Sequence, residues 1–193
     1  MKKHLTTAFL MTIATTILLG VLYPLLITAL AQVLFRDKAN GQIRYRNGEA
    51  IGSRIIGQPF VSAKYFHSRP SAAGNGYDAA NSGGTNYAPT NQKLIGRVRS
   101  DASSLHQENP AEPIPVDLLT TSASGLDPEI SPSAAEFQIP RIARERALPE
   151  STVRDLVQQH TVQRDLGLFG EPRVNVLELN LALDALSGSH PEK

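Results

Sequence analysis

The side chains that could do chemistry are sparse and scattered along the sequence. Five histidines occur, and no two of them share the spacing of metal ligands on one predicted helix or strand. Cysteine is absent, so the chain has neither a thiolate nucleophile nor a disulfide framework. The phosphate-loop pattern GxxxxGKS/T and the nucleophile elbow GxSxG are missing as well. These observations argue against a self-sufficient enzyme and against a metal site.

Two polar segments remain as candidate binding sites. His67-Ser68-Arg69, which follows Tyr65, is the densest polar cluster, and it fits either an interaction surface or a solvated loop. Ser82-Gly83-Gly84-Thr85 could present backbone N–H groups to an anion, but it lacks the lysine of a phosphate loop and is better explained by glycines in a turn. Asp127 precedes a proline, which is typical of a turn or cap residue.

The elements that must position these side chains begin with a hairpin. Residues 43–46 alternate apolar and basic side chains, Asn47-Gly48 suits the positive-φ positions of a tight turn, and residues 51–56 can return as the partner strand. Residues 71–86 are mostly Ser, Ala, Gly and Asn. An irregular tract of this length inside a small domain is either functional or disordered.

Helices and short strands follow. A helix is predicted to begin near Asn91, with an apolar face formed by Leu94, Ile95, Val98, Ala102 and Leu105. Residues 116–120 form a short apolar run that we expect to be a strand. Ser131 and Pro132 match an N-cap followed by proline at the first helical position, and Pro140 should kink or restart that helix.

The last third of the sequence predicts two more elements. A helix starting at Pro149 should bury Val153, Leu156 and Val157. Residues 173–176 resemble a strand that feeds a Leu-rich segment ending at Leu186. Alternate leucines there would also suit a strand, but Glu, Leu and Ala are good helix formers and favour a helix.

An apolar stretch, Leu5–Phe35, precedes all of these elements and contains no charged side chain. It exceeds the roughly 20 residues that a membrane-spanning helix needs. A retained anchor is favoured over a secretory signal cleaved after Ala31, because a signal's apolar region spans only about 7–15 residues. Pro24 should kink this helix. The threonines near its start either admit another membrane helix or bond back to their own backbone.

Charge and composition limit the function further. The net charge is +1 and there is no cluster of Lys and Arg, so nothing indicates nucleic-acid binding. Basic residues flank the apolar stretch on both sides, which leaves its orientation open. The expected fold is a single N-terminal transmembrane α-helix followed by one mixed α/β soluble domain with long Gly/Ser/Asn-rich loops. The expected organisation is a basic flank (1–4), the helix (5–35) and the soluble domain (36–193).

Several stretches together resemble one family, the C subunit (KdpC) of the bacterial high-affinity potassium-transporting P-type ATPase. They occur in the family's order across nearly the whole sequence, and Tyr23-Pro24 lies in the expected place. The departures are slight, namely Thr85 after the two glycines and Tyr87 where an aliphatic residue is expected. The matching stretches are Tyr65–Ser71, Ser82–Asn86, Pro89–Asn91, Thr121–Pro132, Gln138–Ala143 and Gly170–Asp184.

The resemblance implies a non-catalytic subunit in the bacterial cytoplasmic membrane, with one membrane helix and an extracytoplasmic soluble domain. Its implied partners are a channel-like potassium-translocating subunit, a P-type ATPase subunit and a small accessory membrane peptide, together with membrane lipid. The family's C subunit is needed for assembly and is also described as a catalytic chaperone that raises the pump subunit's affinity for ATP. No tightly bound cofactor is expected, and ATP would be met only through the complex.

We expect the docking face of such a subunit to lie on its polar loops. The residues that we predict to bind partners are Tyr65, His67, Arg69, Ser82, Gly83, Gly84, Asn86, Asn91, Ser124, Gly125 and Asp127. Gln138 is the candidate for a nucleotide contact, although a helix-surface or capping amide is the favoured role for it. Two alternatives stay open: an extracytoplasmic module that controls potassium access, and a secreted binding domain released by cleavage.

Overall fold

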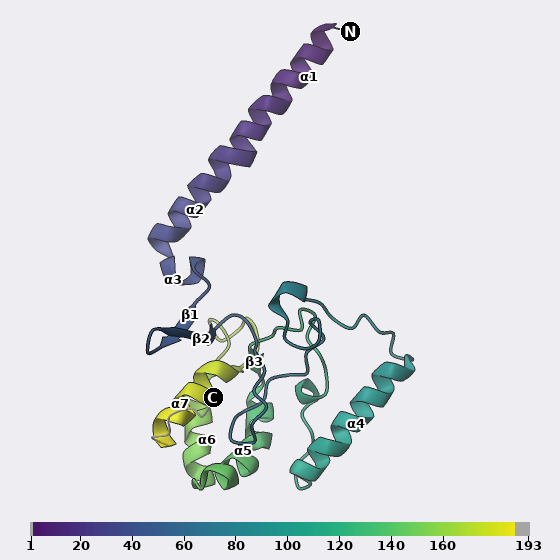
Figure 1. The fold of residues 1–193 in the computed structure, drawn as a ribbon, viewed down its shortest axis with the longest axis vertical. Helices are drawn as coiled ribbons and strands as arrows, with labels where there is room; N and C mark the ends of the chain where they lie inside the picture. The colour runs from purple at the N-terminus through teal and green to yellow at the C-terminus, as the bar shows by residue number, and fades with distance from the viewer. Residues whose placement is uncertain (1, 188–193) are drawn as a thin grey trace. The chain divides into compact units, whose positions relative to one another are not determined.

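The computed structural model describes residues 2–187 and separates the chain into two compact units. Unit 1 extends to Ile43, and unit 2 begins at Arg44. Figure 1 shows unit 1 as one long helix followed by a short one, and unit 2 as a mixed assembly of helices, short strands and irregular segments. This confirms the predicted fold of an apolar N-terminal helix followed by a mixed helix and sheet domain.

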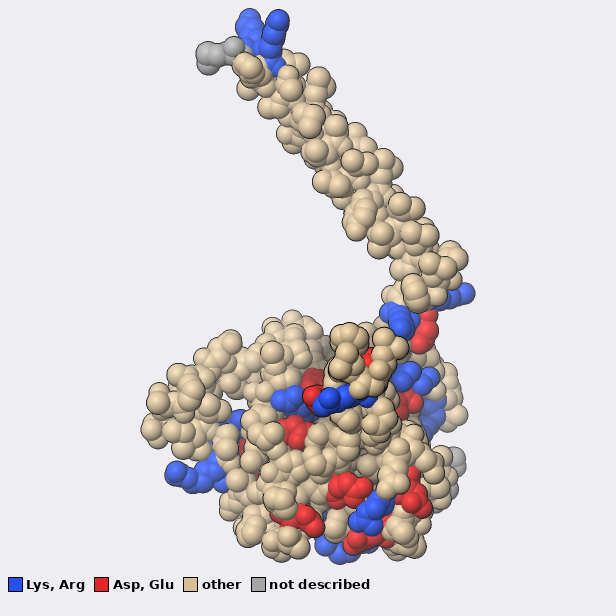
Figure 2. All heavy atoms as spheres, turned by 180° about the vertical axis from the view of Figure 1, so that it is seen from behind, with Lys and Arg blue, Asp and Glu red and all other residues tan. Residues whose placement is uncertain are grey.

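Unit 1 is built from α1 (Lys2–Thr15), a π-helical segment (Thr16–Leu22), α2 (Tyr23–Leu34) and the short α3 (Arg36–Ala39). The run from Lys2 to Leu34 is long and apolar enough to cross a membrane. In Figure 2 the charged side chains of unit 1 lie only near its two ends, before and after the apolar stretch. These properties suggest membrane association, and a signal sequence near an N-terminus would share them.

Pro24 is accommodated within this helix by the π-helical segment that precedes it. The N–H of Tyr23 donates to the carbonyl of Leu18, five residues earlier, so the hydrogen-bond register is already shifted when the chain reaches the proline. The threonines of α1 follow the second of the two predicted roles. The hydroxyls of Thr6, Thr7 and Thr12 each donate to the carbonyl four residues before them, at 2.9–3.0 Å.

Unit 2 opens with the predicted hairpin. Strand β1 (Ile43–Arg46) pairs with β2 (Glu49–Ser53), and Asn47 and Gly48 take φ values of 53° and 86° in the turn between them. The returning strand starts and ends earlier than the predicted 51–56. It stops at Ser53 because a tight turn follows, in which Ile56 N–H donates to the Ser53 carbonyl.

The core of unit 2 lies between a small antiparallel sheet and three helices. The strands are β3 (Glu129–Ile130), β4 (Thr161–Val162) and β5 (Arg173–Asn175), and β5 is the central one. The helices are α5 (Pro132–Arg146), α6 (Glu150–Gln159) and α7 (Val176–Ser187). The Leu-rich segment forms a helix, as the sequence favoured. This helix, α7, buries Leu179 and Leu183 in the core. Val153, Leu156 and Val157 of α6 are buried as predicted.

The helix caps follow the sequence closely. Asn91 caps α4 (Gln92–Glu108) by accepting from Lys93 N–H at 2.8 Å, and the predicted apolar face of α4 is half-buried. Ser131 caps α5 by accepting from Ala134 N–H at 3.0 Å. The sequence predicted that the helix would kink or restart at Pro140, but α5 continues through Pro140 without a break. The residues on either side of Pro140 are buried, and that packing keeps the helix continuous where one backbone bond is lost.

One predicted strand is wrong. Residues 116–120 form a 3₁₀ turn (Val116–Leu118) in which Leu118 N–H donates to the Pro115 carbonyl at 3.1 Å and the Thr120 hydroxyl donates to the Val116 carbonyl at 2.9 Å. Leu118 reaches the core, while Val116 is 70% exposed. These local bonds satisfy the backbone without a neighbouring strand.

Candidate functional site

After a turn at residues 62–65, the chain enters the core at Phe66, and side-chain amides bond to its backbone in place of a neighbouring strand. Asn180 on α7 accepts from Phe66 N–H at 2.8 Å and donates to the Phe66 carbonyl at 3.0 Å. Gln138 on α5 makes the same two bonds to His67, accepting from its N–H at 2.7 Å and donating to its carbonyl at 3.1 Å. Both amide side chains are 1% exposed. Two successive residues are therefore clamped between two helices.

This burial corrects the favoured role for Gln138, which is neither a surface amide nor a cap. Its Nε2 also donates to the Ala134 carbonyl at 3.1 Å, and its Oε1 also accepts from Arg141 at 2.7 Å. Arg141 in turn pairs with Glu108 at 2.8 Å and donates to the Tyr65 carbonyl at 2.9 Å. The amide is thus the centre of an internal polar network that fixes the loop containing His67.

Tyr65 is anchored by a second network at the end of α7. Its hydroxyl donates to Asp184 at 3.2 Å, and its ring lies under the guanidinium of Arg146, 4.9 Å from its centre. Arg146 also pairs with Asp184 at 2.8 Å. Burial, followed by the charge of Asp184, raises the pKa of the Tyr65 hydroxyl. Tyr65 therefore helps to fix the structure as well as being a candidate for partner contact.

The ring of His67 faces a small pocket of about 230 Å³ between this loop and α4. Arg69, Tyr77, Leu105 and Gln138 also line the pocket. Burial, followed by the charge of Arg141, lowers the pKa of His67. The ring is held by a hydrogen bond of 3.1 Å between Nε2 and the Ser62 carbonyl. This site holds a neutral imidazole more readily than a charged one.

Three loops meet next to this pocket, and we call their meeting point the loop junction (residues 69–73, 82–84 and 122–127). The Ser71 hydroxyl donates to the Gly125 carbonyl at 2.6 Å. Gly83 N–H and the Ser82 hydroxyl both donate to the Ser124 carbonyl at 2.9 Å. The predicted loops are therefore tied to the predicted connector by direct hydrogen bonds.

Gly125 is the tightest point of the loop junction. It is buried and has a φ of +67°, a conformation that side chains disfavour. A Cβ atom there would lie 2.6 Å from the Ala73 nitrogen and 2.8 Å from the Gly83 oxygen. Gly84 approaches the same connector, since its Cβ would lie 3.2 Å from the Ala123 oxygen. The close approach of the loops requires glycine at 125 and leaves little room for a side chain at 84.

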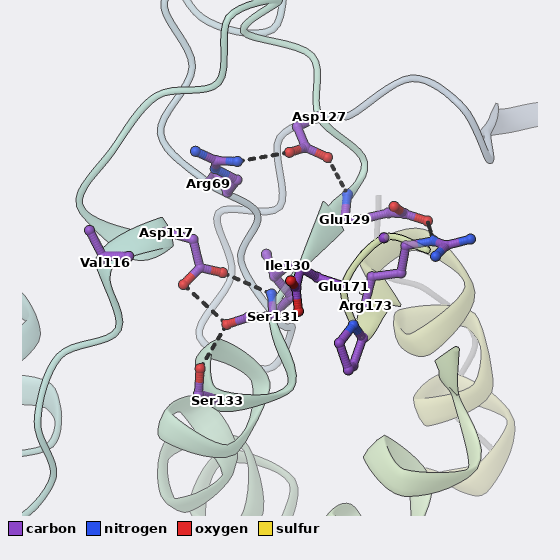
Figure 3. A pocket seen from close by; sticks show the side chains of 12 residues that line it. Arg69, Val116, Asp117, Asp127, Glu129, Ile130, Ser131, Ser133, Glu171 and Arg173 are labelled. Carbon is purple, nitrogen blue, oxygen red and sulfur yellow. Dashed lines mark hydrogen bonds and ion pairs between the residues drawn. The ribbon is translucent and has the colours of Figure 1, made fainter. Parts of the chain in front are cut away.

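A charged pocket of about 520 Å³ opens beside the loop junction (Figure 3). Arg69 pairs with Asp127 at 3.0 Å, and Asp127 also accepts from Glu129 N–H at 3.0 Å. Glu129 pairs with Arg173 at 3.2 Å on the other side of the pocket. Burial, opposed by Arg173, raises the pKa of Glu129. The pocket therefore combines paired charges with an exposed apolar side chain, Val116.

Asp117 also lines this pocket, in a role that no sequence pattern predicted. Its carboxylate accepts from the backbone N–H of Ser131 at 2.8 Å and from the Ser131 hydroxyl at 3.2 Å. Ser131 is the cap of α5, so Asp117 fixes the start of that helix. Among residues 2–187, no three His, Asp or Glu side chains are grouped so that they could hold a metal ion.

The structure brings most of the predicted binding residues together, but not all of them. Arg69, Ser82, Gly83, Gly84, Ser124, Gly125 and Asp127 lie in the loop junction, and His67 is adjacent to it. Asn86 is exposed at a φ of 52°, and Asn91 is the cap of α4. Asn180, Asp184 and Arg141 were missed as network residues. Polar side chains at 180 and 184 within a Leu-rich helix, one helical turn apart, were the signal.

Known proteins of one family match this chain over nearly its whole length. The family model described as KdpC, K⁺-transporting ATPase c chain, matches residues 5–185. A potassium-transporting ATPase KdpC subunit of Koribacter versatilis is 67% identical over 184 residues, covering 95% of each chain. Subunits of the same name from Acidobacterium capsulatum and Rhodopseudomonas palustris are 56% and 52% identical, covering 95% and 96% of this chain and 99% of each relative.

Proposed function

The chain belongs to the KdpC family, the c chains of the K⁺-transporting ATPase, and from this premise we propose that it acts by docking on the other subunits of the complex. In this proposal it is a non-catalytic subunit that helps to assemble and stabilise a channel-like subunit and a P-type pump subunit. A small accessory membrane peptide completes the set of proposed partners.

The observation that carries the proposal is the loop junction. Its loops are fixed by hydrogen bonds among themselves, and the segment before them is clamped by Asn180 and Gln138. A surface that is already ordered loses little conformational entropy when it binds. Val116, 70% exposed beside the paired charges of the pocket, offers the mixture of apolar and charged contacts that is typical of protein interfaces.

We propose that any effect on ATP is indirect. The amide of Gln138, the residue considered for a nucleotide contact, is buried and bonded to His67, Ala134 and Arg141. An indirect effect requires that this chain bind one state of the pump subunit more tightly than another, and thereby shift the populations of the two states. Such coupling needs no nucleotide site on this chain.

We further propose a single-pass anchor with unit 2 outside the cytoplasm. The helix from Lys2 to Leu34 supports the anchor by its length and composition. A compartment-sensitive reporter at the C-terminus tests the orientation, because it should be active only outside the cytoplasm. Intact mass of the membrane-extracted protein distinguishes a retained anchor from a segment cleaved after Ala31.

The assembly function is tested by purifying the complex through a tag on this chain. We expect the channel-like and pump subunits to copurify with it, and the ATP concentration for half-maximal hydrolysis to be lower in its presence. Normal assembly with altered potassium transport in loop variants would favour the alternative role as an access module. Recovery of this chain without either subunit would contradict the proposal.

A further inference from the structure

A tight turn between β4 and β5 carries three large apolar side chains into solvent. Leu166, Leu168 and Phe169 are 93%, 71% and 60% exposed. The turn is ordered by its own backbone, since Phe169 N–H donates to the Asp165 carbonyl at 2.9 Å and Asp165 N–H donates back at 2.8 Å. We call residues 166–169 the apolar turn. The hydrogen-bonded backbone of the turn therefore holds these apolar side chains in solvent.

Two ion pairs join the two sides of the base of the apolar turn, and one of them reaches β5. Arg164 pairs with Glu171 at 2.5 Å, and Asp165 lies 3.8 Å from Arg173. Leu166 and Gly167 take φ values of 54° and 73°, which reverse the chain direction within two residues. The left-handed conformation is unfavourable for leucine, and Leu166 gains no burial within unit 2 in return.

The apolar turn lies at the end of unit 2 where the chain enters from unit 1. Two residues after Arg173, Asn175 donates to the Arg54 carbonyl at 2.8 Å. Glu178 then pairs with Arg44, the first residue of unit 2, at 2.5 Å, and with Arg54 at 3.3 Å. The path from Arg173 to Glu178 covers about 10 Å at the usual rise of strand and helix. The base of the turn and the entry point therefore share one end of the unit.

The same end exposes further apolar side chains on and after the β1–β2 hairpin. Tyr45, Ile55 and Ile56 are 65%, 52% and 39% exposed. Ile55 follows Arg54, the residue whose carbonyl is bonded to Asn175. Monomeric soluble domains rarely gather exposed large apolar side chains in one region without a partner. Tyrosine in such a group suits the membrane–water interface, where one part of its ring is apolar and its hydroxyl is hydrated.

A lipid surface is always within reach of this end if the anchor is retained. The apolar helix ends at Leu34, and the segment from there to Arg44 spans at most about 35 Å when fully extended. We propose that the apolar turn, together with Tyr45, Ile55 and Ile56, inserts into the interfacial region of the bilayer. The inference rests on the membrane anchorage proposed above and adds a second, peripheral contact of unit 2 with lipid.

Site-specific fluorescence tests this contact, because the chain contains no cysteine of its own. Leu168→Cys in the full chain provides a single thiol for an environment-sensitive fluorophore. The labelled protein is reconstituted in phosphatidylcholine vesicles that contain a nitroxide-bearing acyl chain. Ser103→Cys on α4 is the control at an exposed polar site, and Val61→Cys, at a residue 90% exposed, is the control at an exposed apolar site.

The proposal predicts a blue-shifted emission at position 168 with strong quenching by the nitroxide lipid and little quenching by aqueous iodide. Both controls should show the opposite pattern. Iodide quenching at 168 that equals the controls, in protein whose intact mass retains residues 5–35, overturns the lipid contact and leaves the anchor standing. A shift at 168 that appears only after the other subunits are added also overturns it, in favour of a protein contact. An intact mass that shows cleavage after Ala31 would instead refute the anchorage itself.

Discussion

The side-chain amide of Gln138 bonds to both backbone polar groups of His67, accepting from its N–H at 2.7 Å and donating to its carbonyl at 3.1 Å. Asn180 does the same for Phe66 from another helix. A strand would normally satisfy these buried backbone groups. Here two amides replace it, and the loop that follows starts from a fixed point. Loss of either amide should therefore affect both stability and the position of the loop junction.

Replacing Gln138 with Met should destabilise unit 2 strongly. The two side chains are similar in volume, so the main effect is to leave the backbone groups of His67 buried without partners. Each such group costs about 1–3 kcal/mol, so the two together give an expected loss of roughly 2–6 kcal/mol. Chemical unfolding of the full chain in detergent measures the loss. Gln107→Met, at an exposed position on α4, is the matched control and should change stability little. Equal effects of the two changes would contradict the clamp.

Gly125→Ala should separate the loops of the junction. The added Cβ would meet the Ala73 nitrogen at 2.6 Å and would also force alanine into a φ of +67°. Gly48→Ala is the control for the second effect alone, because Gly48 has a φ of +86° and nothing within 4 Å of the added atom. The left-handed penalty of about 1–2 kcal/mol applies to both variants, and we expect Gly125→Ala to lose measurably more. Similar losses would show that the close approach is unimportant.

His67 should make stability depend on pH. Burial lowers its pKa in the folded chain, so the unfolded chain binds the proton more readily. Stability should therefore fall as the pH drops below about 6.5, the ordinary value for histidine, until the lowered folded pKa is reached. The His67→Gln variant lacks this contribution. On acidification, the midpoint of thermal unfolding of the unchanged protein should fall more than that of His67→Gln. Above about pH 7.5, the difference between the two midpoints should be constant. A difference that is independent of pH throughout would rule out this role of His67.

Much of the fold could be predicted, because local rules are strong here. Ser131 and Asn91 are caps by residue type, and Asn47-Gly48 is a turn by its tolerance of positive φ. The strand predicted for residues 116–120 was wrong because a short apolar run carries no information on whether a neighbouring strand exists. The networks around Gln138 and Asp184 depend on contacts between segments more than 70 residues apart in sequence, with His67 and Tyr65 respectively, and no local pattern encodes them.

The predicted binding residues were likewise predictable only in part. The loops that resemble the family do meet, and Gly84 and Gly125 fit their close approach. The sequence did not distinguish residues that hold the loops from residues that could face a partner. Tyr65 and Arg69 are half-buried and engaged with Asp184 and Asp127, so replacing them would disturb the fold as well as any interface. An exposed residue beside the junction is the better probe.

Val116→Asp therefore tests the central claim that the loop junction docks on the other subunits. Val116 is 70% exposed in the pocket beside Arg69 and Asp127, so the substitution should leave the fold intact while placing a charge in the interface. Val61→Asp is the same change at a residue that is 90% exposed outside the junction. The measurement is the amount of channel-like and pump subunit that copurifies with each tagged variant. We predict a loss on the order of tenfold for Val116→Asp and none for Val61→Asp. Equal, wild-type recovery with both variants would contradict the account.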